Sequence, residues 1–184
     1  VDFYAEQYTP AIAAFNRFLT AVPDHNAAPH YYKAFALRES GENGAALAEF
    51  QNIIDTHTGD ELWAASWIEM ARTYWLWIGD LPAATETLLN FVAAAPADAR
   101  APEALDLAAS IAERDGQLAQ AAEVWERLAS EYPSSPQASL AAFDYGLVLF
   151  RAGDFASAAQ RFQQSSALTS DPARLAAAQL WAGK

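Results

Sequence analysis

A fourfold repeat constrains this chain more than any other feature. Four glycines mark it at intervals of 38, 37 and 37 residues: Gly41, Gly79, Gly116 and Gly153. Each glycine is followed after five residues by Ala and after nine by Phe, Leu or Trp. The residue after twelve is apolar in three copies and is Ser165 in the fourth. A period in this range is typical of solenoids, whose repeats bury a continuous core by stacking.

The composition favours helices throughout. Apolar residues make up 53% of the 184 residues, and about a quarter of the chain is Ala, the strongest helix former. Apolar residues recur at helical spacing before and after each glycine. Each unit therefore reads as helix, tight turn, helix, with the glycine ending the first helix. The clearest pair is predicted over Pro102–Asp115 and Ala119–Tyr132.

We expect one helical repeat domain over residues 1–184. It contains a partial repeat at 3–22, full repeats at about 27–58, 62–96, 101–133 and 137–170, and a partial repeat at 172–184. The chain begins at Val1 without Met and stops inside a repeat, so we expect it to be a segment of a longer protein. Helix starts are predicted where a capping side chain precedes proline, at Thr9-Pro10, Ser135-Pro136 and Asp171-Pro172.

The repeat resembles the tetratricopeptide repeat. The third unit carries the pattern in full, as Gly116, Leu118, Ala121, Trp125, Leu128 and Pro133. The second unit carries it as Gly79, Leu81, Ala84, Leu88, Phe91 and Pro96, and the fourth departs from it only at Ser165. The resemblance implies an all-α solenoid, a right-handed superhelix of antiparallel helix pairs. A small residue is expected midway along each first helix, and Arg72 departs from that expectation in the second unit.

A second resemblance is narrower. The segment Tyr132–Ala138 and the ending Ala176–Lys184 are similar to repeats of bacterial envelope proteins, including the helical superhelix of soluble lytic transglycosylases. This resemblance implies the alternative that the chain is a structural part of a peptidoglycan-acting enzyme, with the catalytic domain elsewhere. It also slightly favours the bacterial periplasm, or another extracytoplasmic location, over the cytoplasm.

Several functions are disfavoured by composition and motif. The net charge of −12, with two lysines, disfavours nucleic acid as a partner. No apolar run is long enough to span a membrane. The three histidines, His25, His30 and His57, lack metal-ligand spacing, and the Glu39-Ser40 pair stands at a helix end. We therefore expect no catalytic residue, cofactor or metal in this segment, and predict that it is not an enzyme.

An aromatic-rich segment, Leu62–Ile78, is the strongest sign of a binding surface. Two apolar stripes run along it, one through Ile68, Ala71, Trp75 and Ile78 and the other through Trp67, Met70, Tyr74 and Trp77. A helix that is apolar on most sides is either buried by several neighbours or offers one side to a ligand. Both interpretations are open at this point.

Tetratricopeptide arrays line their concave surface with the first helix of each repeat. By register, this groove would contain Tyr31, Phe35, Arg38, Glu69, Thr73, Trp77, Glu103, Asp106, Phe143, Leu147, Phe150 and Arg151. The set is apolar at both ends and acidic between them. The predicted function is a non-catalytic scaffold for a protein or peptide with basic and apolar residues.

Overall fold

The computed structural model describes residues 3–184, with side chains from Tyr8 onward, and every regular element in that range is a helix. The chain divides into two compact units, Val1–Phe91 and Val92–Lys184. The first contains α1 (Phe3–Ala21), α2 (Ala28–Glu39), α3 (Asn43–Thr56), α4 (Trp63–Arg72) and the π-helix η1 (Thr73–Ile78). The division falls inside α5 (Leu81–Ala94). The second contains α6 (Ala101–Arg114), α7 (Leu118–Glu131), α8 (Ala138–Arg151), α9 (Phe155–Ala167) and α10 (Pro172–Ala182).

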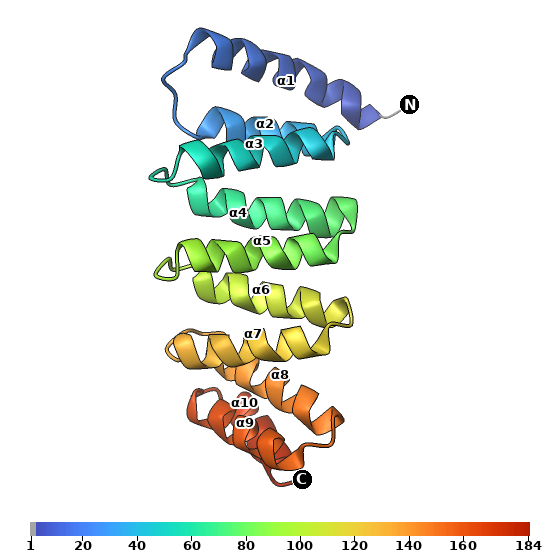
Figure 1. Cartoon of the computed structure of the whole chain (residues 1–184), viewed down its shortest axis with the longest axis vertical. Coiled ribbons are helices and arrows are strands. Elements are labelled where there is room, and N and C mark those ends of the chain that lie inside the picture. Colours follow the sequence, from blue (N-terminus) through green and yellow to red (C-terminus); the bar gives the residue numbers. More distant parts are fainter. Residues whose placement is uncertain (1–2) are drawn as a thin grey trace. The chain divides into compact units, whose positions relative to one another are not determined.

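Each unit is built from antiparallel helical hairpins (Figure 1). In the first unit α2 packs against α3 and α3 against α4, and in the second α6 packs against α7, α7 against α8 and α8 against α9. This is the all-α, tetratricopeptide-like solenoid fold that the repeat predicts. The organisation of the two units as one domain stays a prediction.

The four repeat glycines end the first helices, as predicted. All four have a positive φ between 80° and 87°, a region that residues with a Cβ rarely adopt. At Gly116 the peptide N–H bonds to Glu113 O, and the next N–H, of Gln117, bonds to Ala112 O, which together close the helix end. The same pair of bonds recurs at Gly41 and Gly153.

The turn at Gly79 differs from the other three by one residue. Here the N–H after the glycine, that of Asp80, reaches back to Tyr74 O, six residues away, where the other turns span five. The preceding residues form η1, whose wider turns accommodate one extra residue. This extra residue accounts for the interval of 38 residues between Gly41 and Gly79, where the other two intervals are 37.

The extra residue corrects one sequence expectation. Counting back from Gly79 places Arg72 at the position where the other repeats carry a small residue. In the structure Ala71 is fully buried and Arg72 is 40% exposed on its side chain. The π-helix shifts the register by one, so the expected small residue is Ala71, which is buried as Ala34 and Ala109 are in their own repeats.

The cores follow the repeat register on the second helices. At nine residues after each glycine lie Phe50, Leu88, Trp125 and Phe162, none of them more than 2% exposed. At twelve residues after lie Ile53, Phe91, Leu128 and Ser165, which are all buried as well. The fourth repeat therefore buries a hydroxyl where the others bury hydrocarbon.

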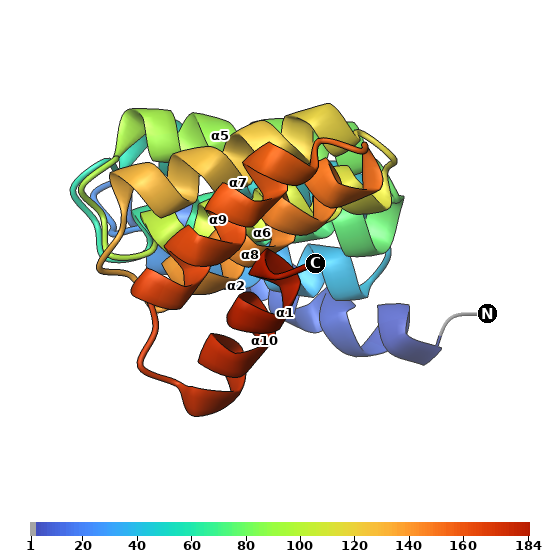
Figure 2. The same ribbon diagram turned by 90° about the horizontal axis from the view of Figure 1, so that it is seen from below.

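Only one of the three expected proline starts is correct. Asp171 caps α10 by accepting hydrogen bonds from the backbone N–H groups of Ala173 and Arg174, with Pro172 as the first helical residue. Pro10 instead lies inside α1, which begins at Phe3, and α8 begins at Ala138 behind the cap residue Gln137. Figure 2 shows α9 and α10 at the C-terminal end, joined by the loop before Asp171.

Candidate partner-binding faces

In the first unit, the predicted groove residues form a closed cluster around Arg38. Its guanidinium lies 4.4 Å from the ring centre of Phe35 and 4.0 Å from that of Trp77. Its Nη1 pairs with Glu69 Oε2 at 2.9 Å and contacts Thr73 Oγ1 at 3.5 Å. Arg38 is only 5% exposed. The cation is therefore enclosed by two aromatic faces and a carboxylate, and its charge is neutralised within the unit.

Tyr31 extends this cluster towards the core. Its ring lies 5.0 Å from Phe35 and 5.9 Å from Phe50, centre to centre. Burial, followed by the nearby Glu69 carboxylate, raises the pKa of the Tyr31 hydroxyl. Tyr31 thus belongs to the packing behind the face.

The exposed part of this face lies on η1. Leu76, Trp77 and Ile78 are 56%, 39% and 45% exposed, although all three are large and apolar. Upstream, Met70 is buried, and Trp67 and Tyr74 pack against the core. Each interpretation of the aromatic segment therefore holds for one part of it. The first part is buried in the core, and the last turn is exposed.

In the second unit, the corresponding face is acidic. Glu103 is exposed on the first turn of α6, and Asp106 is partly buried one turn later. Burial, and to a lesser degree Glu103, raises the pKa of Asp106. The indole N–H of Trp125 acts in the opposite direction, although within residues 3–184 it has no acceptor in hydrogen-bonding geometry.

Asp144 on α8 is the residue that the sequence register missed. Burial, then the neighbouring carboxylates of Asp106 and Glu113, raises its pKa to about 7. Arg151 opposes this shift but is itself paired with Glu113 at 3.3 Å. Three carboxyl groups lie near a single cation, Arg151, so their negative charges are not fully neutralised. The remaining repulsion disfavours ionisation of Asp144. The signal available in the sequence was the helical spacing of seven residues between Asp144 and Arg151, which places both on one side of α8.

The apolar residues predicted on α8 have divided roles. Phe143 packs on Phe162 at 5.3 Å, and Phe150 contacts Phe155 at 5.1 Å and Trp181 at 5.2 Å, between ring centres. Leu147, which lies between these two residues along α8, is half-buried. These aromatic residues are largely occupied by contacts with α9 and α10, whereas Arg151 is 62% exposed on its side chain.

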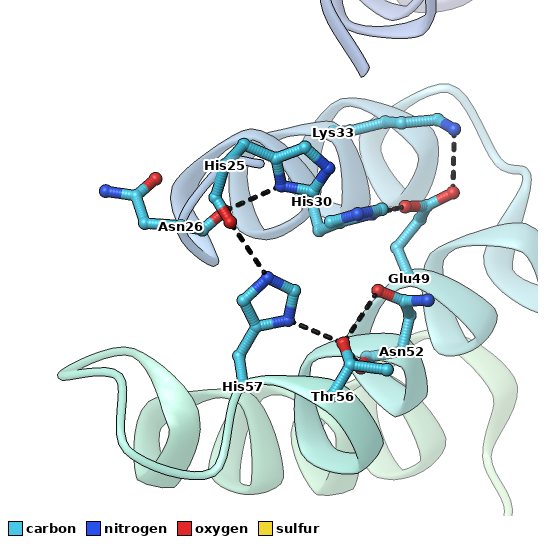
Figure 3. Close-up of polar contacts among 8 residues, drawn as sticks. All are labelled: His25, Asn26, His30, Lys33, Glu49, Asn52, Thr56 and His57. Atoms are coloured by element: carbon cyan, nitrogen blue, oxygen red, sulfur yellow. Dashed lines mark hydrogen bonds and ion pairs between the residues drawn. The ribbon is translucent and has the colours of Figure 1, made fainter. Parts of the chain in front are cut away.

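The structure also brings together the three histidines (Figure 3). Their ring centres lie 5.0 to 5.9 Å apart, with His25 before α2, His30 on α2 and His57 at the end of α3. His30 and Lys33 share the carboxylate of Glu49. His57 contacts the Thr56 hydroxyl through Nδ1 and the His25 carbonyl through Nε2. His25 and His57 stand in successive inter-repeat loops, a placement from which their approach could have been inferred.

These histidine contacts join the loop before α2 to the end of α3. Within the described residues, no group of three or more His, Cys, Asp or Glu side chains is placed to hold a metal ion. A membrane-crossing helix is also absent from residues 3–184, since none is both long and apolar enough.

Comparison with known proteins identifies the repeat. The family model of the tetratricopeptide repeat matches residues 103–135, which span α6, the Gly116 turn and α7. A comparison with curated protein sequences finds no match.

Solved structures match over nearly the whole chain. A crystal structure of MamA has a TM-score of 0.59 at 17% identity, covering 91% of this chain and 95% of that one. BtubC (BKLC) from P. vanneervenii gives 0.58 at 14% identity, covering 98% and 80%. A putative kinesin light chain of Podosopora anserina, described as having nearly identical TPR-like repeats, gives 0.56 at 16% identity, covering 90% and 89%. At these identities the likeness shows the fold.

The family match and the fold agree with each other. Tetratricopeptide repeats generally mediate protein–protein interactions and are typically non-catalytic, whereas the comparisons give no support to the lytic transglycosylase alternative. The glycine register and the helical hairpins agree with the match at residues 103–135, so the chain carries a tetratricopeptide repeat in that region and has a tetratricopeptide-like fold.

Proposed function

We propose that the chain is a scaffold that binds a cationic protein segment on the first-helix face of its second unit. The observation that carries this proposal is the grouping of the half-buried Asp144 with Asp106 and Glu113, where Arg151 is already paired with Glu113 at 3.3 Å. Burial and the two neighbouring carboxylates raise the pKa of Asp144 to about 7. A Lys or Arg side chain placed among these carboxylates would relieve their repulsion and favour the ionised form of Asp144. The net charge of −12 would steer such a partner towards the chain.

The first unit supplies a different kind of contact. Leu76, Trp77 and Ile78 offer exposed apolar area on the last turn of η1, and Trp77 is held in place by its stacking on Arg38. A fixed aromatic side chain loses little entropy on binding and makes a good anchor contact. We therefore expect partner segments to combine basic residues with at least one large apolar residue.

The acidic face should make binding of a cationic segment tighter as the pH rises. With a pKa of about 7, Asp144 is mostly protonated at pH 6 and mostly ionised at pH 8. A cationic segment should consequently bind more tightly at pH 8 than at pH 6, and added salt should weaken binding at pH 8 more strongly.

Selection from a random 15-residue peptide library tests the proposal. The full chain should enrich peptides rich in Lys or Arg with an apolar residue, and an Asp106→Asn, Asp144→Asn double variant should lose this enrichment. Glu123→Gln is the matched control, because Glu123 is an exposed acid on the second helix α7. Enrichment that is the same for the double variant and wild type would exclude the acidic face as the binding site.

A further inference from the structure

The fourth repeat contains a pocket at the position where it departs from the repeat. The pocket has a volume of about 280 Å³ and lies between α8, α9 and α10. Its lining consists of Ser139, Leu140, Phe143, Ser165, Ala173, Arg174 and Ala177. Ser165 replaces the buried Ile, Phe or Leu found at the same register in the other three repeats.

The floor of the pocket offers no free hydrogen to a ligand. The Ser139 hydroxyl donates to Ser165 O at 2.9 Å, and the Ser165 hydroxyl donates to Ser139 O at 2.7 Å. Both side chains are at most 3% exposed. Because each hydroxyl has a single hydrogen and has already committed it, the inner part of the pocket suits a hydrocarbon group.

The other walls agree with this. Leu140 is 40% exposed and Phe143 is partly buried, so both present apolar surface at the opening. Ala173 and Ala177 form the opposite wall on α10 with small side chains. An apolar cavity of roughly 150 Å³ is enough to hold benzene, so this pocket has room for a longer hydrocarbon body.

Arg174 supplies the one charge in the lining. Its Nε lies 3.9 Å from Asp171 Oδ2, and its Nη1 donates to Pro136 O at 3.4 Å, so both contacts are long. Asp171 already accepts bonds from two backbone N–H groups at the start of α10. The guanidinium is therefore weakly held, half-exposed, and placed to pair with an anion.

We propose that this pocket binds a small amphiphilic carboxylate, with an alkyl or aryl body inside and the carboxylate on Arg174. Charge complementarity selects this occupant over a neutral or cationic one, since Arg174 is the only charged residue among the lining side chains. None of Asp106, Glu113 and Asp144 lines the pocket, so this ligand site is independent of the proposed partner face.

Octanoate is the probe, with octylamine as the matched control of opposite charge. Titration of the full chain, followed by methyl NMR, should give saturable shifts at Leu140, Ala173 and Ala177. Octylamine should bind at least tenfold more weakly. Arg174→Gln should weaken octanoate binding by at least threefold and leave octanol binding unchanged.

Filling the pocket tests its location. Ser165→Leu restores the repeat residue and should abolish octanoate binding, and Ala177→Leu fills the space from α10 if the first variant fails to fold. Ala176→Leu, next to it on α10 but outside the lining, should bind as wild type does. Octanoate binding that survives both filling variants, or equal binding of octylamine, would overturn the proposal. If the filling variants lose binding of a partner peptide but keep binding of octanoate, the pocket holds a protein side chain. That result would also overturn the proposal.

Discussion

The two units use the same helical hairpin but treat charge on the first-helix face in opposite ways. In the first unit Arg38 is buried between two aromatic rings and paired with Glu69, so its charge is neutralised within the unit. In the second unit the exposed Arg151 pairs with Glu113 and lowers the pKa of Asp144, but burial, Asp106 and Glu113 still raise that pKa to about 7. The difference shows that a repeat specifies where a side chain lies, whereas the neighbouring repeats decide whether its charge is satisfied.

Removing the large side chain behind the acidic face should produce the largest effect. Trp125 is 2% exposed and occupies the register position that Phe50 and Phe162 occupy in their repeats. Trp125→Ala should lower the free energy of unfolding by about 3–5 kcal/mol, because it leaves a cavity among helices that cannot close completely. Urea unfolding measures the change. A loss below about 1 kcal/mol would mean that this part of the core tolerates a void.

The buried cation of the first unit should come next. Arg38→Met keeps most of the side-chain volume but removes the charge that faces Glu69, Phe35 and Trp77. We expect a loss of about 2–4 kcal/mol, since the variant leaves a partly buried carboxylate with less compensation. Arg72→Ala is the control, because Arg72 binds the same carboxylate at 2.7 Å from a more exposed position. Equal losses in thermal unfolding would contradict the distinction between the buried and the exposed cation.

A packing prediction concerns the small residue in the first helix of the fourth repeat. A Cβ at Gly146 would lie 2.7 Å from Phe162 Cε1, so Gly146→Ala forces a fully buried ring to move. The expected cost is about 1–3 kcal/mol. Gly44→Ala, on α3, meets nothing within 4 Å and should instead stabilise the chain by up to about 1 kcal/mol. Calorimetry of both variants should therefore show shifts of opposite sign.

The sequence predicted the repeat, the glycine turns and the buried second-helix positions, because these follow from periodic spacing along one helix. It could not predict η1, since the extra residue changes the count by only one and has no characteristic composition. Nor could it predict that Arg38 stacks on Trp77, or that Asp144 lies near Asp106, because these contacts pass between different helices. The placement of the twelve groove residues as one binding surface stays a prediction.

Neutralising Asp144 should stabilise the chain at high pH. Its pKa is raised from 3.8 to about 7, so the folded state holds the proton more tightly than the unfolded state does. Stability from this group is therefore complete below about pH 4 and declines as the pH rises towards 7. Each pKa unit corresponds to about 1.4 kcal/mol, and partial exposure reduces the effect, so Asp144→Asn should add about 1–2 kcal/mol at pH 8. The free energy of unfolding, measured between pH 4 and 8, should vary less with pH in the variant than in wild type. The same pH dependence in both would contradict the burial of this carboxyl.

The smallest effect should come from the exposed cation of the second unit. Arg151 pairs with Glu113 at 3.3 Å, but the two side chains are 62% and 40% exposed, and water screens such pairs. Arg151→Ala should therefore change the free energy of unfolding by less than about 0.5 kcal/mol. It should nevertheless raise the pKa of Asp144 further, because Arg151 is the one cation that lowers it. Carbon-detected NMR titration of the Asp144 carboxyl measures this shift apart from stability. A stability loss as large as that of Arg38→Met, or an unmoved Asp144 titration, would remove the contrast between the two faces, since the acidic face would then be neutralised internally as the first one is.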